Sequence, residues 1–260
     1  MKISIILALL YRDFLLFSRA KWRLVETFYF PITTVLIWGL FSVFMKDFSL
    51  EAGLIVLIMN VFWNFAYISQ STTNMSMLED IWSGGFKQLF VSGIDETDFV
   101  VSRLVFSTII SSFLMVILFL ITYYVFDLTV LVTHFSVILP LILITLVSSL
   151  ALSILVAAFM LAGGREYTFL SWTILQIFVL LSAPFYTVDI LPQPLQYIAQ
   201  VMPYTDVFES ARNLITLGGV NSQLVWKGFI ISVSYILMSL PVYYFAFHSA
   251  RKNGNLVKLS

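Results

Sequence analysis

Six long apolar stretches constrain the fold of this 260-residue sequence more than any other feature. A helix needs about 20 apolar residues to cross the hydrocarbon core of a bilayer, and each stretch reaches that length. They occupy residues 25–45, 53–72, 101–126, 135–162, 168–188 and 224–248. Charged residues make up only 11% of the chain, too few to cover the surface of a soluble domain. We therefore expect a single-domain, all-α integral membrane protein with six transmembrane helices.

The basic residues are distributed unevenly between the segments that connect these stretches. Eleven of the 14 Lys and Arg residues fall in the two terminal segments and in the second and fourth connections. Only Lys46, Arg212 and Lys227 remain for the other face. By the positive-inside rule, both termini are cytoplasmic, in a multi-pass protein of the cell (inner or plasma) membrane. The formal net charge of zero argues against a nucleic acid partner.

The first 20 residues have a helical periodicity of their own. Apolar side chains recur at steps of four and three, while Arg12 and Arg19 project elsewhere. The apolar positions are Ile3, Leu7, Leu10, Phe14 and Phe17. This pattern predicts an amphipathic helix over residues 3–20 that lies in the cytoplasmic interface, in contact with membrane lipids. The alternative is an upstream extension of the first span, since Pro31 can lie inside a kinked helix.

The second connection, residues 75–98, combines acidic residues with apolar and aromatic residues at helical spacing. Gly84 and Gly85 interrupt the series, at about 1 kcal/mol of helix propensity each, so we expect a short helix, a break and a second short piece. The aromatic residues have charged neighbours, an arrangement typical of a protein–protein contact. The alternative is an ordinary loop that packs its aromatic side chains on the membrane face. We favour a docking site for a soluble partner.

Polar residues within the apolar stretches are further candidates, because such residues in spans often mark functional sites. Asn60 and Asn64 are four residues apart and share a helical face. The complete set is Thr33, Thr34, Asn60, Asn64 and Gln176. The alternative is that each only bonds a neighbouring helix, at about 0.6 kcal/mol on average. The aromatic residues at the ends of the first span, including Trp22 and Trp38, are interpreted as interfacial anchors.

Residues 184–219 contain prolines that prevent one continuous spanning helix. These are Pro184, Pro192, Pro194 and Pro203. The pattern predicts two short amphipathic helices that dip into the outer leaflet as a re-entrant hairpin. Thr205 or Asp206 is the expected N-cap of the second helix and Gly218-Gly219 its C-terminal stop. Glu209 and Arg212 are three residues apart on one helix and are expected to support the hairpin.

The segment PFYTVDILPQPLQYIAQVMPYTDVFESARNLI resembles the region after the fifth span in ABC-2 type permeases, the membrane subunits of ATP-binding-cassette exporters. The family pattern has an aromatic–proline turn, a Leu-Pro, a short helix, a second proline and a Glu-to-Arg pair. Phe185-Tyr186, Leu191-Pro192, Pro203, Glu209 and Arg212 fill those places. Thr187 departs from the pattern, because the family often has a proline there. Residues 11–39 and 78–103 are similar to the family's interfacial helix with span one and to its coupling-helix region.

The resemblance implies a permease that pairs as a homodimer and docks onto a separate nucleotide-binding ATPase. This chain has no glycine-rich loop ending in Gly-Lys-Ser or Gly-Lys-Thr, so the ATPase would be the subunit that binds ATP and Mg²⁺. The permease itself would need no cofactor. The implied contacts with the ATPase are Glu79, Asp80, Trp82, Phe86, Arg165 and Glu166. For Arg165 and Glu166 the alternative is a topology anchor with a local ion pair. The implied cargo is amphipathic, a lipid, a drug or a glycan, moved out of the cytoplasm along the polar candidates of the spans.

Two other classes of function are weighed against this one. An ion-coupled secondary transporter would be expected to show repeat symmetry between its halves, and none is evident. A membrane enzyme would need a nucleophile motif or metal ligands. His134 and His248 fall at opposite faces and cannot share a metal, and no Cys is present. We therefore expect a transport subunit without catalytic residues or a metal site.

Overall fold

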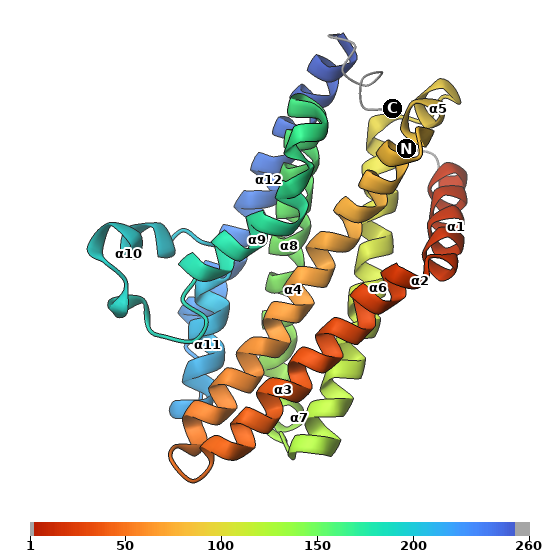
Figure 1. Cartoon of the computed structure of the whole chain (residues 1–260). Helices are drawn as coiled ribbons and strands as arrows, with labels where there is room; N and C mark the ends of the chain where they lie inside the picture. The colour runs from red at the N-terminus through yellow and green to blue at the C-terminus, as the bar shows by residue number, and fades with distance from the viewer. Residues whose placement is uncertain (1–2, 253–260) are drawn as a thin grey trace.

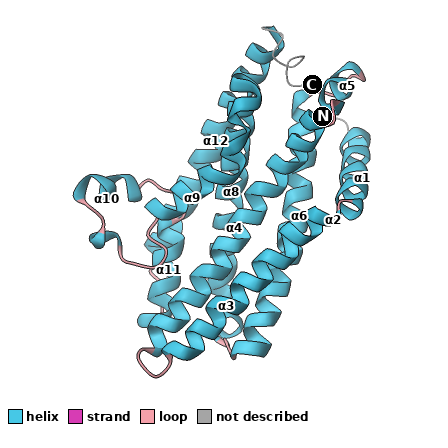
Figure 2. Ribbon diagram, in the orientation of Figure 1, coloured by secondary structure: helices cyan, strands magenta, loops and turns pink. Residues whose placement is uncertain are grey.

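The computed structural model describes residues 3–252 as helices joined by short connections (Figure 1). Within that range Figure 2 shows helix and loop but no strand, which confirms the all-α prediction. The long helices are α3 (Phe30–Met45), α4 (Leu50–Trp82), α6 (Glu96–Phe126), α8 (Phe135–Gly163) and α12 (Ser222–Lys252). The shorter elements are α1 (Ile3–Arg19), α2 (Lys21–Leu24), the π-helical turn η1 (Val25–Tyr29), α5 (Gly85–Val91), α7 (Val130–Thr133), the 3₁₀ turns η2 (Gly164–Phe169) and η3 (Val188–Ile190), α9 (Leu170–Leu181), α10 (Gln193–Ala199) and α11 (Thr205–Thr216).

Five helices are long and apolar enough to cross a membrane among the residues that the structure describes. The first is the continuous helical stretch Lys21–Met45, which consists of α2, η1 and α3. The other four are α4, α6, α8 and α12. The fifth predicted span, residues 168–188, is not confirmed at full length. The apolar helix there covers only Glu166–Leu181, which is about 24 Å, against a hydrocarbon core of about 30 Å. The helix ends because Ala183 adopts φ of 51° and Pro184 follows it.

Helix α4 is much longer than the predicted span at residues 53–72. The Ser49 hydroxyl caps its N-terminus by accepting a hydrogen bond from the Ala52 amide at 3.3 Å. The helix then continues without a break through the expected docking segment to Trp82. The predicted break at the glycine pair is confirmed, since Gly84 has φ of 71° and α5 begins at Gly85. The first short helix of the prediction is therefore the end of α4.

The N-terminal helix α1 is separate from the first span, because the chain leaves helical geometry at Ala20 (φ −84°, ψ 86°). It packs against α6 through Ile6, Leu9, Asp13 and Phe17. The predicted apolar stripe is mostly on the opposite side, where Ile3, Leu7 and Phe14 are exposed. This exposed apolar side is what a helix in the membrane interface needs. The interfacial position itself stays a prediction.

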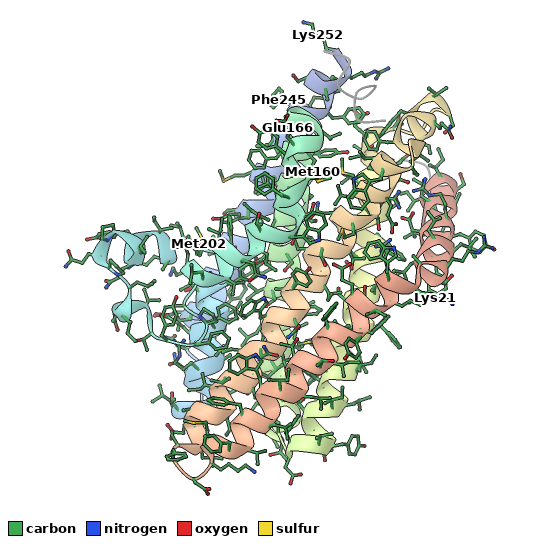
Figure 3. All side chains as sticks on the ribbon, in the orientation of Figure 1. Lys21, Met160, Glu166, Met202, Phe245 and Lys252 are labelled. Carbon is green, nitrogen blue, oxygen red and sulfur yellow. The ribbon has the colours of Figure 1, made fainter. Side chains whose placement is uncertain are left out.

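The two ends of the bundle are distinct. Figure 3 labels Glu166 and Lys252 near the end that also carries α5, while α7 and the connection from α3 to α4 lie at the other end in Figure 1. Met202, between α10 and α11, lies away from both ends. Helix α11 packs against α4, α8 and α12. The expected C-terminal stop is confirmed by α11 ending at Thr216 and by Gly218 having φ of 68°.

The expected N-cap of α11 is wrong. Tyr204 occupies the cap position without a side-chain cap, and the Thr205 hydroxyl instead donates to the carbonyl of Ala199 at 2.6 Å. Asp206 is buried, and its carboxylate accepts a hydrogen bond from Lys227 on α12 at 3.0 Å. The Asp206 carboxylate therefore pairs with a neighbouring helix and does not cap its own helix.

Helix α4 occupies the centre of the bundle, where it contacts α3, α6, α8, α9 and α11. Its N-terminal part approaches α3 closely at Gly53. A Cβ atom added to Gly53 would lie 2.7 Å from the backbone oxygen of Ser42. Real Cβ atoms do not come so close to a carbonyl oxygen, so a side chain there would force the two helices apart. This packing holds α3 beside α4 and thereby positions the site described below.

Gly53→Ala is expected to destabilise the protein by about 1–3 kcal/mol, because the added methyl group overpacks the contact between α3 and α4. The effect should appear as a lower midpoint of thermal unfolding in detergent. Gly219→Ala is the matched control, since a Cβ atom added there would meet nothing within 4 Å. Equal midpoints for the two variants would contradict the close approach of the helices.

Candidate functional site

A cavity of about 260 Å³ lies between α3, α4 and α9. Aromatic rings and a few amide and hydroxyl groups line it, the combination that ligand pockets usually present. The lining residues are Phe30, Pro31, Thr34, Trp38, Asn60, Trp63, Asn64, Tyr67 and Gln176. On α3 and α4 these positions recur mainly at steps of three and four, which places them on one face of each helix.

Four of the five polar candidates from the spans line this cavity, and Thr33 does not. Thr34 donates a hydrogen bond to the Phe30 carbonyl at 2.6 Å. The Asn64 amide donates to the Asn60 carbonyl oxygen at 2.8 Å and to the Asn60 side-chain oxygen at 3.0 Å. The described residues offer no hydrogen bond to the Gln176 amide, so this group is available to a molecule in the cavity.

Two adjoining cavities extend this one in both directions. A cavity of about 360 Å³ shares Trp63 and Gln176 with it and reaches the loop after α9. A cavity of about 590 Å³ shares Phe30 and Tyr67 with it and reaches α2. Because neighbouring cavities share lining residues, we treat the three as one groove and refer to it below as the groove.

Aromatic rings lie close together where the two smaller cavities of the groove adjoin. Trp38 stacks on Phe185, with ring centroids 6.0 Å apart and an interplanar angle of 22°. Trp63 lies 6.0 Å from the same ring. Trp38 thus lines the groove, and its role as an interfacial anchor stays a prediction. The sequence does not reveal this, because a Trp near the end of a span has the same pattern in both settings.

A cluster of buried charges lies between α1, α4 and α6. Arg103 on α6 is 1% exposed and forms ion pairs with Asp13 on α1 and Asp80 on α4. Arg12 contacts both oxygens of Asp80 at 2.8 Å and one oxygen of Asp13 at 3.3 Å. The Arg103 guanidinium also lies 5.0 Å above the ring of Phe99. The two arginines and two aspartates, called the charge cluster below, carry no net charge together, which a low-dielectric interior requires.

A second ion pair and a polar run on α4 accompany the charge cluster. Arg23 pairs with Glu79 at 2.8 Å and donates to the Ser76 hydroxyl at 3.2 Å. Residues 69–76 of α4 are buried, and several of their polar groups bond to neighbouring helices. The bonds run from Asn74 to the carbonyl of Ser153 on α8 at 2.9 Å, from Gln70 to that of Ser171 on α9 at 3.4 Å and from Ser107 on α6 to that of Ser69 at 2.5 Å. The sequence signal, SQSTTNMS, is visible but lies at the predicted end of a span.

The structure separates the expected ATPase contacts into exposed and internal residues. Trp82 is 48% exposed at the end of α4, and Glu166 is exposed. Phe86 is completely buried against Phe90 and Phe99, and Asp80 belongs to the charge cluster. Neither side chain is available to a partner in this structure, because Asp80 is bound by Arg12 and Arg103 and the Phe86 ring is covered by neighbouring rings. Glu79 is half-buried in its ion pair, and the side chain of Arg165 lies outside the described part of the chain.

Arg212 organises the turn that ends α9. Its guanidinium donates hydrogen bonds to the carbonyls of Ala183 at 2.9 Å, Pro184 at 3.2 Å and Tyr186 at 2.7 Å. Among the described residues, Glu209 and Arg212 form no ion pair with each other. Arg212 therefore binds backbone carbonyls of the loop that follows α9, and the support of a re-entrant hairpin by Glu209 and Arg212 stays a prediction. Pro192 is exposed, and Pro203 is buried before α11.

The two carboxylates of α11 lie in a partly dry environment. Asp206 is 1% exposed, and its Oδ2 atom accepts no hydrogen bond from the described residues. Its other oxygen is bound by Lys227, whose side chain is 46% exposed and so keeps contact with the surroundings of the bundle. Glu209 is half-buried one turn further along. A buried carboxylate requires a cation or a donor to offset its desolvation, and Lys227 supplies it for Asp206.

Comparison with known proteins decides the family. The model of the ABC-2 type transporter family matches residues 5–216, which is most of the chain and includes the groove and the charge cluster. The chain belongs to the ABC-2 type transporter family. No curated protein matches it. ABC-2 membrane domains are permease subunits of ABC transporters and are not themselves catalytic. With its membrane-spanning helices, the chain is a multi-pass transport component. The groove is a candidate path in this ABC-2 permease.

Arg103→Gln in this ABC-2 permease is expected to lower the free energy of unfolding by about 3–5 kcal/mol, because it leaves a buried carboxylate without its partner. The measurement is thermal unfolding of the full chain in detergent. Arg19→Gln, on the exposed side of α1, is the matched control and should leave the midpoint unchanged.

The double variant Arg103→Gln with Asp13→Asn tests the same interaction in the other direction. It should recover part of the loss, because the unpaired carboxylate is removed as well. A midpoint for Arg103→Gln equal to that of the Arg19→Gln control would show that the charge cluster does not hold the helices together.

Proposed function

We propose that this chain is the membrane-spanning permease subunit of an ATP-driven exporter, that two copies form the translocation path and that a separate ATPase drives them. Family membership supports the transport role. The ATPase would bind ATP and Mg²⁺, since the sequence has no phosphate-binding Gly-Lys-Ser or Gly-Lys-Thr loop of its own. The energy would then reach the permease as a mechanical displacement.

One observation supports this proposal above all others: a single helix, α4, carries both the groove and the expected docking end. Asn60 and Asn64 line the groove, and Trp82 ends the helix about 27 Å beyond Asn64 at about 1.5 Å per residue. The helix contains no Pro or Gly between these points. A displacement applied at Trp82 therefore moves the groove face of α4 as a rigid body.

The charge cluster would make α1 and the start of α6 follow that displacement. Asp80 lies two residues before Trp82 and is bound from α1 by Arg12 and from α6 by Arg103. The interfacial helix and α6 would then act with the end of α4 as one docking platform. Within it Trp82 offers an exposed side chain to the ATPase, and Glu79 is half-exposed next to Arg23. Glu166 on η2 would be a separate exposed contact.

The groove is the proposed half-path. A second copy of the chain would complete the path. Its aromatic rings and amide groups fit an amphipathic cargo, such as a drug, a lipid or a glycan. Thr34, Asn60, Asn64 and Gln176 would contact that cargo, while Thr33 would not.

The proposed topology places both termini and α5 in the cytoplasm, in the cell (inner or plasma) membrane. Helix α9 alone is too short to cross, so we propose that α10 and α11 form a re-entrant hairpin in which α11 carries the chain to the outer face before α12. The position of Met202 away from both ends of the bundle supports this arrangement (Figure 3). The Arg212 bonds would satisfy the backbone carbonyls at this depth, where no water replaces them.

The test is reconstitution of the tagged chain into liposomes, alone and together with the ATPase that co-purifies with it. Uptake of a fluorescent amphipathic lipid analogue and ATP hydrolysis are measured together. Accumulation is expected only when both subunits and ATP are present. Accumulation by the permease alone under an ion gradient would overturn the proposal and favour an ion-coupled secondary transporter.

Trp82→Ala is expected to lower ATP-driven transport and recovery of the ATPase complex without changing the unfolding midpoint, because an exposed ring on the platform is removed. Phe86→Ala is the contrasting variant. Its ring is buried, so it should destabilise the protein by about 3–5 kcal/mol instead of uncoupling a stable one. Normal complex recovery and transport by Trp82→Ala would exclude Trp82 from the contact.

A further inference from the structure

The end of the groove nearest α2 combines an acidic side chain with aromatic rings. The cavity there, of about 590 Å³, is lined by Trp22, Val25, Glu26, Phe30 and Tyr67. Its size is typical of sites for drug-sized ligands. The sequence alone gives Glu26 no evident role, because a carboxylate at the edge of an apolar stretch is indistinguishable from an ordinary interfacial charge.

The local backbone places these side chains on one face. Trp22, Glu26 and Phe30 follow one another at steps of four, and Glu26 lies in the π-helical turn Val25–Tyr29. Such turns are rare and frequently occur at functional sites, because the extra residue re-aims the side chains around it. Tyr67 reaches the same cavity from α4. Figure 1 shows this segment at the edge of the bundle, where α2 joins α1 to α3.

Glu26 forms no ion pair with a basic residue among residues 3–252. Its only hydrogen bond there comes from the Tyr67 hydroxyl at 3.5 Å. The nearest basic residue on the same segment, Arg23, is buried and already paired with Glu79 at 2.8 Å. Lys21 is exposed at the start of α2 (Figure 3 labels it). The half-buried carboxylate therefore has no cation in direct contact, and an incoming cation can pair with it.

Aromatic rings around a carboxylate are the chemistry that recognises organic cations. A ring face attracts an ammonium or phosphonium group through its quadrupole, and the attraction is stronger where water is excluded. Trp22, Phe30 and Tyr67 supply three such rings beside Glu26. The same cavity continues into the aromatic groove through Phe30 and Tyr67, so an apolar substituent of the ligand has a place to lie.

We propose that Glu26, with Trp22, Phe30 and Tyr67, forms an entry site for lipophilic organic cations at the α2 end of the groove. This inference rests on the proposed export function and names the chemical class of the cargo. A cation held by Glu26 would have its apolar part directed along the groove toward Asn64 and Gln176. An anion of the same shape would be rejected by the carboxylate.

The experiment compares two ions of the same shape and opposite charge, tetraphenylphosphonium and tetraphenylborate. Binding of each radiolabelled ion to the full chain in a non-ionic maltoside detergent is measured by equilibrium dialysis, with empty micelles as background. The wild-type chain is expected to bind the phosphonium at least about tenfold more tightly than the borate, the ratio that corresponds to about 1.4 kcal/mol. Equal affinities would overturn the proposal without the need for any variant.

Variants then locate the charge and the rings. Glu26→Gln should weaken phosphonium binding about tenfold, whereas Glu26→Asp should keep most of it and Glu51→Gln, an exposed acid elsewhere, should change nothing. Trp22→Ala should weaken phosphonium binding with the charge still in place. Unchanged phosphonium affinity in a folded Glu26→Gln chain would overturn the proposal. If that variant does not fold, unchanged affinity in Trp22→Ala would do so.

Two further arms separate this site from its alternatives. Displacement of the phosphonium by phosphatidylcholine but not by phosphatidylglycerol would assign the site to a choline headgroup and overturn its assignment to cargo. Reconstitution with the ATPase separates the inference from the proposed function. Cation binding through Glu26 without ATP-driven transport would support the proposed site and contradict the proposed export function. ATP-driven transport without cation binding would support the export function and contradict the site.

Discussion

The Arg103 guanidinium lies where three helices meet, and the arrangement of this end of the protein depends on its partners. A buried charge is costly in a low-dielectric interior unless it is paired and hydrogen-bonded, so Arg103 requires both Asp13 and Asp80. Those two residues are on α1 and α4, while Arg103 is on α6. The pairing therefore specifies how the three helices meet. Apolar contacts alone, which are non-directional, would define this geometry less sharply.

The polar run at residues 69–76 of α4 also fixes how helices pack, in this case through hydrogen bonds on the way toward the groove. In a membrane, apolar side chains distinguish poorly between neighbouring helices and lipid tails, so hydrogen bonds between helices help to set the packing. Residues 69–76 take part in such bonds with α6, α8 and α9. Helix α4 is thus tied to its neighbours on the side of the charge cluster, and beyond the polar run it presents Asn60 and Asn64 to the groove. The groove face of α4 and the charge cluster therefore belong to one connected unit.

The features that depend on local chemistry could be predicted from the sequence. The helix break at Gly84, the stop near Gly218 and the shared face of Asn60 and Asn64 all follow from backbone preferences or helical spacing. Features that distant residues decide could not be predicted in this way. In the sequence, Arg23 and Arg103 are only charges that orient the chain, yet both are buried in ion pairs with residues far away along it. The pattern around Phe86 likewise does not reveal that Phe90 and Phe99 cover its ring. The extension of α4 to Trp82 and the end of α9 at Leu181 could not be predicted from local sequence patterns either.

The position of Arg103 in the chain also bears on how the protein is made. Asp13 and Asp80 are synthesised well before Arg103, so during translation the first two long helices enter the membrane with a cation still to come. Arg12 is the only member of the charge cluster with a positive charge that is present from the start. Asp13 and Asp80 thus lack one of their two cationic partners until α6 has been synthesised. Biogenesis of this permease would then commit to its native helix order only once the third long helix is inserted.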